Sequence, residues 1–355
     1  MKNEEFATAQ QFFHFSSKVS LSTQRAMGLK FFILHSSFFI FFRIFAPMNQ
    51  QQTDEYFMRR CLQLAANGLM GARPNPMVGA VIVNEDMIIG EGYHVRCGEG
   101  HAEVNAFASV RNEDEPLLRE ATMYVSLEPC SHYGKTPPCA DLIIRKGVRR
   151  VVVGTIDPFA EVQGRGIQKL RNAGIDVTVG VLEKECEWLN RRFFTFHREH
   201  RPYIILKWAQ SADGFIDRDF HAVQISNAET SRLSHQLRAE EDAILVGHTT
   251  FERDQPQLNV RHWAGPDPKR IVLTHDRPLP QLIRDLYQQG VQSLVVEGGA
   301  RTHQSFFDAG LWDELRVETS PVVFGNGTRA ARIPADAKLL SSQSYGENQY
   351  GVYLH

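Results

Sequence analysis

The sequence predicts an α/β protein made of two domains. A chain of 355 residues is long for a single hydrophobic core, which favours two. Short apolar runs typical of buried strands alternate with segments of helical periodicity between residues 54 and 319. Strands that alternate with helices along a chain are typical of layered α/β domains.

The first domain is predicted to begin with a helix over residues 54–69, where apolar residues recur with helical spacing. It is predicted to end with one charged helix over residues 183–198, which Arg201 and Pro202 terminate. Between them we predict strands at 78–83, 87–93, 122–127, 148–154 and 175–181, and helices at 101–110, 139–146 and 166–173.

The second domain repeats this alternation from residue 203 onward. We predict strands at 203–209, 243–247, 270–274, 293–297 and 314–319, and helices at 226–240, 281–289 and 302–309. The domain boundaries are therefore expected at residues 48–198 and 199–355.

Residues 1–47 differ from the rest because they contain a Phe-rich apolar run over residues 30–43. A membrane-spanning helix needs about 20 apolar residues, and His35, Ser36 and Ser37 interrupt this run. Met48 then opens a polar stretch that leads into the first helix. We interpret residues 1–47 as a disordered extension or as sequence upstream of the native start, with a weak membrane anchor or targeting segment as the alternative.

The composition excludes several classes of protein. A net charge of −2 provides no overall basic field for nucleic acid, so neither a nucleic acid nor a membrane partner is expected. Five scattered cysteines indicate a reduced, cytoplasmic protein in which metal binding is favoured over disulfides. We expect a homo-oligomer.

The combination of His101, Cys130 and Cys139 predicts a zinc site. His101 and Cys139 each lie at a predicted helix start, where a thiolate is stabilised by the helix N-terminus. Glu103, two residues after the histidine, supplies the acid that zinc-assisted hydrolysis requires. A purely structural zinc is the alternative, and it would need a fourth ligand such as His132.

Four segments then resemble a known family. Residues 74–79, 92–94, 101–103 and 128–139 are similar to the deaminase half of the bifunctional riboflavin-biosynthesis family, the diaminohydroxyphosphoribosylaminopyrimidine deaminase/5-amino-6-(5-phosphoribosylamino)uracil reductases. The eight residues between Cys130 and Cys139, SHYGKTPP, distinguish this family from nucleic-acid deaminases, whose cysteines are separated by two residues. The resemblance extends from Met48 to the C-terminus.

For the first half, the resemblance implies a cytidine-deaminase-like αβα layered domain. It implies zinc on His101, Cys130 and Cys139, with Glu103 as the proton shuttle. Hydroxide would attack the amino-bearing carbon of a small phosphorylated pyrimidinone, and ammonia would leave. The implied substrate contacts are Asn75, His94, His132 and Lys135. The alternative for His94 is a buried structural role. The alternative for Lys135 is a solvated position in a loop.

For the second half, residues 207–214, 237–261 and 297–299 resemble the reductase half, which has a dihydrofolate-reductase-like α/β fold. NADPH would deliver hydride to C1′ of the ring-opened ribosyl group. The implied substrate contacts are Arg238, Leu258, Arg261 and Glu297. The implied NADPH contacts are Ala209, Thr250, Asp254, Gly299, Ala300, Arg301, Thr302, His303, Gln304 and Ser305.

The chain departs from the family pattern near residues 275–292, where only one helix fits and a strand with its loops is missing. A missing strand would open the sheet and leave apolar residues uncovered. The alternative function is therefore a deaminase whose C-terminal half is only a scaffold or oligomerisation module. Two further alternatives are less favoured. The cysteine spacing argues against a tRNA-type adenosine deaminase, and Glu103 argues against a non-catalytic binding module stabilised by zinc.

Overall fold

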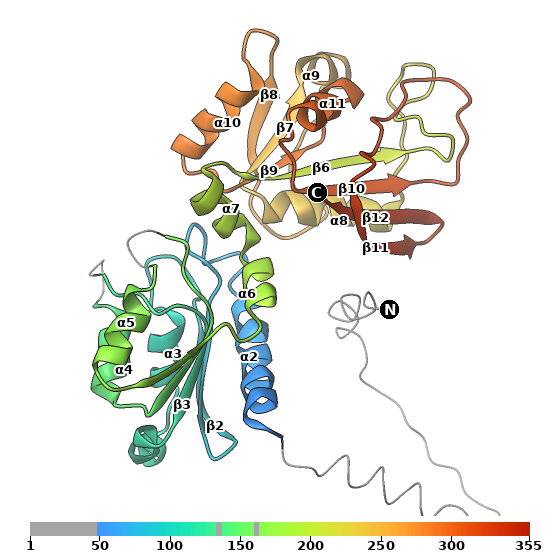
Figure 1. Ribbon diagram of the computed structural model, residues 1–355. Coiled ribbons are helices and arrows are strands. Elements are labelled where there is room, and N and C mark those ends of the chain that lie inside the picture. Colours follow the sequence, from blue (N-terminus) through green and yellow to red (C-terminus); the bar gives the residue numbers. More distant parts are fainter. Residues whose placement is uncertain (1–47, 133–136, 160–162) are drawn as a thin grey trace, which may run out of the picture. The chain divides into compact units, whose positions relative to one another are not determined.

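The computed structural model describes residues 48–132, 137–159 and 163–355 (Figure 1). The predictions for residues 1–47 and for Lys135 lie outside these ranges. Within them, every helix falls short of the length and apolar character needed to cross a bilayer.

A mixed sheet of five strands forms the centre of the N-terminal half. Its order is β2-β1-β3-β4-β5, with β1 antiparallel to both neighbours and the remaining pairs parallel. The strands are β1 (Gly79–Asn84), β2 (Met87–Tyr93), β3 (Thr122–Leu127), β4 (Arg150–Thr155) and β5 (Asp176–Val179). All five were predicted within two residues at each end.

Helices cover both faces of this sheet and make the αβα layering that the resemblance implies (Figure 1). One face packs against α3 (Ala102–Ala108), α4 (Cys139–Lys146) and α5 (Arg165–Asn172) through side chains such as Phe107, Ile143 and Leu170. The other face packs against the C-terminal part of α2 (Gln50–Ala66) and against α6 (Glu183–Leu189). A 3-10 helix, η2 (Asn112–Arg119), precedes β3 and was not predicted.

The single helix predicted over residues 183–198 is wrong, because the chain breaks at Asn190 into α6 and α7 (Arg191–Glu199). The side chain of Asn190 is buried and pairs with the backbone of Met77 in both directions, at 2.8 Å each. These two hydrogen bonds fix the break, since they satisfy the amide side chain with a segment distant in sequence.

A seven-stranded sheet forms the C-terminal half, in the order β11-β12-β10-β6-β9-β7-β8. The pairs from β10 to β8 are parallel, whereas β12 is antiparallel to its neighbours. The strands are β6 (Tyr203–Gln210), β7 (Ala243–Gly247), β8 (Lys269–Leu273), β9 (Ser293–Val296), β10 (Glu314–Thr319), β11 (Lys338–Tyr345) and β12 (Asn348–Leu354).

Alternate residues of β6 enter the two cores of this sheet. Ile204, Leu206 and Trp208 pack on the face that is covered by α10 (Leu279–Gln288) and α11 (Ala300–Asp308). Tyr203 and Ile205 pack on the other face, with Leu237 of α8 (Ala228–Glu240). The C-terminal hairpin of β11 and β12 and the helix α9 (His248–Asp254) were not predicted.

The shortened segment forms α10 directly after β8, as one helix. Leu282, Ile283 and Leu286 of this helix are buried against the sheet. The edge strand β8 begins with two exposed basic residues, Lys269 and Arg270, and charges of this kind protect a sheet edge against pairing with other chains.

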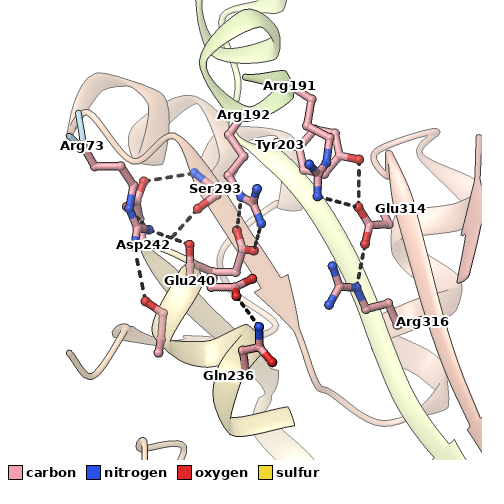
Figure 2. Close-up of polar contacts among 12 residues, drawn as sticks. Arg73, Arg191, Arg192, Tyr203, Gln236, Glu240, Asp242, Ser293, Glu314 and Arg316 are labelled. Atoms are coloured by element: carbon pink, nitrogen blue, oxygen red, sulfur yellow. Dashed lines mark hydrogen bonds and ion pairs between the residues drawn. The ribbon is translucent and has the colours of Figure 1, made fainter. Parts of the chain in front are cut away.

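Helix α7 contacts side chains of both halves, and the predicted boundary between residues 198 and 199 falls inside it. Phe193 and Phe194 pack with Leu127 of the first sheet. Arg192 forms a buried ion pair with Glu241, and Arg191 with Glu314, both from the second half (Figure 2). The two halves are thus joined through a packed helix.

Candidate active sites and family membership

The three predicted zinc ligands lie together in the structure. His101 is the residue that precedes α3, Cys139 is the first residue of α4, and Cys130 follows β3 in the loop between them. One ligand atom from each lies within 4.8 Å of the others. The His101 Nδ1 atom is 3.7 Å from the Cys130 sulfur and 3.4 Å from the Cys139 sulfur.

The surroundings favour a thiolate at Cys130. Hydrogen bonding from Cys139 is the main cause that lowers the pKa of the Cys130 thiol to about 4, and His101 adds to it. The same contact raises the pKa of the Cys139 thiol, and burial adds to this. The backbone N–H of Cys139, at the start of α4, also donates to the Cys130 sulfur at 3.3 Å. Two sulfurs and an imidazole nitrogen are the donor types that zinc prefers.

Glu103 is buried next to this group, with 3% of its surface exposed. Removal from water raises the pKa of its carboxyl group to about 7, and the charge of Cys130 contributes in the same direction. A carboxyl group with this pKa can both accept and release a proton at neutral pH, as a general acid–base catalyst must.

His132 does not join the ligand group. It is exposed, and the metal-binding group in the described ranges consists of His101, Cys130 and Cys139 alone. Three protein ligands leave one position of a tetrahedral zinc free, which is the arrangement of catalytic sites.

Asn75 and His94 form a second polar pair on the wall of the same cavity. The Nδ1 atom of His94 lies 3.1 Å from the carbonyl of Gly100, so that nitrogen carries the proton and the other ring nitrogen accepts from Asn75 Nδ2 at 3.1 Å. Burial lowers the pKa of His94, which favours this neutral form. These contacts are those of a structural histidine, and in the described part of the chain no hydrogen bond reaches the side-chain oxygen of Asn75.

The cavity that contains these residues has a volume of about 520 Å³, large enough for a nucleotide-sized ligand. Sequence reasoning missed part of its lining, namely Asp157, Phe159, Phe193, Phe196, His197 and Gln292. Asp157 was accessible to prediction, because it follows β4 and the carboxyl ends of the parallel strands β3 and β4 meet at one edge. Burial raises the pKa of Asp157 to about 6.

Glu128 has a supporting role that the sequence did not reveal. Its carboxylate accepts hydrogen bonds from the backbone N–H groups of Asp157, Gly164, Gly166 and Ile167, at 2.9–3.3 Å. These bonds hold Asp157 and the start of α5 next to the segment of Pro129 and Cys130. Glu128 therefore stabilises the wall of the cavity.

In the C-terminal half, the predicted substrate contacts lie around one ion pair. Arg238 of α8 and Glu297, just after β9, form two hydrogen bonds of 3.0 and 2.6 Å. Burial alone would raise the pKa of Glu297, but Arg238 and Lys207 lower it below its usual value. Arg238 also donates to the carbonyl of Asn259, at 3.1 Å, which places it beside the loop that carries Leu258 and Arg261.

The predicted cofactor turn lies at the carboxyl ends of β7 and β9. The Gly299 N–H donates to the Thr250 hydroxyl group at 3.2 Å, and a Cβ atom on Gly298 would lie 2.9 Å from the side chain of Thr302. Glycine is therefore required for the close approach of this turn to α11. Gly299 precedes α11, whose N-terminal N–H groups suit a phosphate.

The remaining predicted cofactor contacts differ in exposure. Arg301 and Gln304 are exposed, while Ala209, Ala300, Thr302 and Ser305 are half-buried. Asp254 pairs with Arg253 at the end of α9. The side chain of His303 is buried against Trp208, and its Nε2 atom lies 3.1 Å from the carbonyl of Val296, so only its backbone can face a ligand.

Two family models match the chain. The cytidine and deoxycytidylate deaminase zinc-binding region matches residues 51–155. The RibD C-terminal domain matches residues 202–281 and 278–348. Its two stretches meet at the point where the sequence departs from the family pattern.

Known proteins match over most of the chain. The riboflavin biosynthesis protein RibD of Aquifex aeolicus is 38% identical over 322 residues, which cover 78% of this chain and 89% of that protein. RibD of Escherichia coli is 35% identical over 351 residues, with 82% and 94% covered. The solved structure of the diaminohydroxyphosphoribosylaminopyrimidine deaminase/5-amino-6-(5-phosphoribosylamino)uracil reductase of Thermotoga maritima matches with a TM-score of 0.79 and 33% identity, and covers 86% of this chain and 99% of that one.

These matches agree with the structure, which has a zinc-ligand group in the first sheet domain and a second α/β domain after it. The chain belongs to the RibD family of bifunctional riboflavin-biosynthesis enzymes, which combine a zinc-dependent deaminase with a reductase.

Proposed function

We propose that the chain catalyses two successive steps. The N-terminal half, residues 48–198, would deaminate 2,5-diamino-6-(5-phosphoribosylamino)pyrimidin-4(3H)-one. The C-terminal half, residues 199–355, would use NADPH to reduce the ribosyl group of 5-amino-6-(5-phosphoribosylamino)uracil to ribityl. The observation that carries the first step is the ligand group of His101, Cys130 and Cys139 beside a buried acid, in a cavity of about 520 Å³.

His101, Cys130 and Cys139 would hold the zinc ion, since their donor atoms converge and match its preferences. Bound zinc supplies a nucleophile at neutral pH, because it lowers the pKa of its water to about 7. Glu103 would take the proton from the nucleophile and deliver it to the departing amino group, a role for which its raised pKa is suited.

The substrate ring would be oriented by Asn75, through its free carbonyl oxygen, with His94 holding the asparagine side chain in place. His132 lies at the exposed rim of the cavity, where a phosphate group can remain partly solvated. We assign Lys135 to the same phosphate on the basis of the family resemblance.

In the reductase step, Arg238 and Arg261 would bind the substrate phosphate, with Leu258 and Glu297 beside them. NADPH would lie along Ala209, Thr250, Asp254 and residues 299–305, and supply hydride to C1′. The start of α11 supports this placement, because its N-cap, Gly299, makes no side-chain capping hydrogen bond and helix N-terminal N–H groups suit a phosphate.

The proposal is tested by one substitution with two assays. We expect Glu103→Gln to retain one zinc per chain and to lose ammonia release by about a hundredfold to ten-thousandfold, the usual contribution of a positioned acid–base group. NADPH oxidation with the deaminated intermediate should be unchanged. Unimpaired ammonia release would exclude Glu103 as the proton carrier.

A further inference from the structure

The deaminase cavity is not built by the deaminase half alone. The loop between α10 and β9 contributes Gly290 and Gln292 to its wall. Gln292 is 6% exposed and lies one residue before β9, in the half of the chain that resembles the reductase. A polar side chain that is buried at this place needs hydrogen-bonding partners.

Gln292 is held at both its side chain and its backbone. The side-chain Nε2 atom donates to the carbonyl oxygen of Pro74 at 2.8 Å. The backbone N–H donates to the Asp242 carboxylate at 2.8 Å, and the same oxygen accepts from the N–H of Ser293 at 3.2 Å. Asp242 therefore fixes the backbone at Gln292, and the side chain of Gln292 binds the segment that carries Asn75.

Arg73 fixes the other end of that segment. Its guanidinium group donates to Asp242 at 3.2 Å and to the last carbonyls of α8, those of Ala239 and Glu240, at 3.2 and 2.6 Å. Figure 2 shows Arg73 between Asp242 and the end of α8. Arg73 and Pro74, the two residues before Asn75, are thus both anchored to the C-terminal half.

Asn75 has few anchors within its own half. Its N–H donates to the carbonyl of Ala72 at 2.9 Å, and its side chain contacts His94. A group that must orient a substrate has to be held within about 0.5 Å of its productive position. The hydrogen bonds from the C-terminal half supply this constraint.

We propose that Gln292 is a positioning residue for deamination, which holds the Pro74–Asn75 segment against the substrate cavity. The inference rests on the proposed deaminase function. It means that the reductase half completes the deaminase site, and that substrate binding in the first half depends on a side chain from the second.

The test is Gln292→Met in the full-length protein, which keeps the length of the side chain but cannot donate to Pro74. We expect the KM for deamination to rise by about three- to tenfold, the usual effect of one hydrogen bond, with kcat changed less than twofold. Zinc content and NADPH oxidation should remain at wild-type levels. Gln288→Met is the matched control, since Gln288 is an exposed glutamine at the end of α10, four residues before Gln292, and it should leave all four quantities unchanged.

A second variant tests the other anchor of the segment. Arg73→Gln should raise the same KM, and the effect of the double variant should be smaller than the product of the two single effects, because both act on one segment. An unchanged KM in both single variants would overturn the proposal. A parallel loss of zinc, of NADPH oxidation and of thermal stability would also overturn it, since that pattern indicates a general structural role.

Amide hydrogen exchange separates this inference from the proposed function. Peptides that cover residues 73–79 should exchange faster in Gln292→Met than in the wild type, whether or not the protein releases ammonia. A wild type that releases no ammonia would contradict the proposed function. Unchanged exchange in residues 73–79 would contradict the positioning role.

Discussion

The two halves of the chain assemble their functional residues in different ways. In the N-terminal half, the zinc ligands come from two short motifs, and their donor atoms lie within 4.8 Å of one another. In the C-terminal half, the proposed contacts come from separate segments spread between Ala209 and Ser305, and Arg238 is paired with Glu297. The donor atoms of the first group converge on one point, whereas two side chains of the second group are paired with each other.

The largest effect on activity is expected from Cys130→Ala, which removes one proposed zinc ligand. Loss of one sulfur ligand should abolish zinc binding and slow deamination by about a thousandfold or more, because the pKa of water would return from about 7 toward 15.7. NADPH oxidation should be unaffected if the two sites are independent. Metal analysis and the two activity assays measure this.

Cys97→Ser is the control for metal content, since Cys97 is exposed and lies outside the ligand group. Zinc that remains in Cys130→Ala would contradict the ligand assignment.

A second prediction concerns the ion pairs of α7. Arg192→Met should lower the free energy of unfolding by about 3–5 kcal/mol, because it leaves the buried Glu241 without its charge partner. Arg198→Met is the matched variant, in which the half-exposed pair with Glu187 should contribute only about 0–1 kcal/mol. Urea unfolding measures both, and equal losses would show that burial of the Arg192 pair has no energetic consequence.

The reductase site is tested by Arg238→Ala. We expect kcat/KM for NADPH-dependent reduction to fall by about ten- to a hundredfold, the effect of losing a charge-assisted hydrogen bond to the substrate phosphate. Ammonia release should be unchanged. Arg232→Ala, at an exposed position of the same helix, is the control and should retain the reductase rate. A wild-type rate in Arg238→Ala would remove Arg238 from the proposed site.

A smaller effect is expected from pH on the free energy of unfolding, because His303 binds a proton less tightly in the folded protein. Burial lowers the pKa of His303 from 6.5 to about 4, so the unfolded chain binds this proton more tightly than the folded one. The stabilisation is fully present above about pH 6.5 and is lost as the pH falls toward 4. It amounts to about 2 kcal/mol between pH 7 and pH 5.

Tryptophan fluorescence during urea unfolding measures this loss, since Trp208 lies against His303. The difference between pH 7 and pH 5 should shrink in His303→Gln. An equal difference in the variant and the wild type would assign the pH dependence to other groups.

The sequence predicted most accurately those features that depend on residues close together in the chain. His101 and Cys139 were expected at helix starts, and the structure places them there, because residue type and helical periodicity act over a few positions. The strands were found for the same reason. The hairpin of β11 and β12 was missed because β11 is rich in serine and more than half of its residues are exposed, so it lacks the apolar pattern of a buried strand.

Contacts between distant residues could not be predicted. The break at Asn190 depends on Met77, and the role of Gln292 depends on Pro74. Neither residue carries a local signal, because a single asparagine or glutamine in a polar segment is compatible with solvent. The proximity of the Gln292 loop to the deaminase cavity arises only when both halves are folded.

The central claim is that one chain carries both activities, and NADPH oxidation with the deaminated intermediate tests it most directly. We predict that Cys130→Ala, which has no functional zinc site, oxidises NADPH at the wild-type rate and yields the ribityl product. A folded wild-type protein that releases ammonia but oxidises no NADPH would contradict the claim, and would show that the C-terminal half is a scaffold.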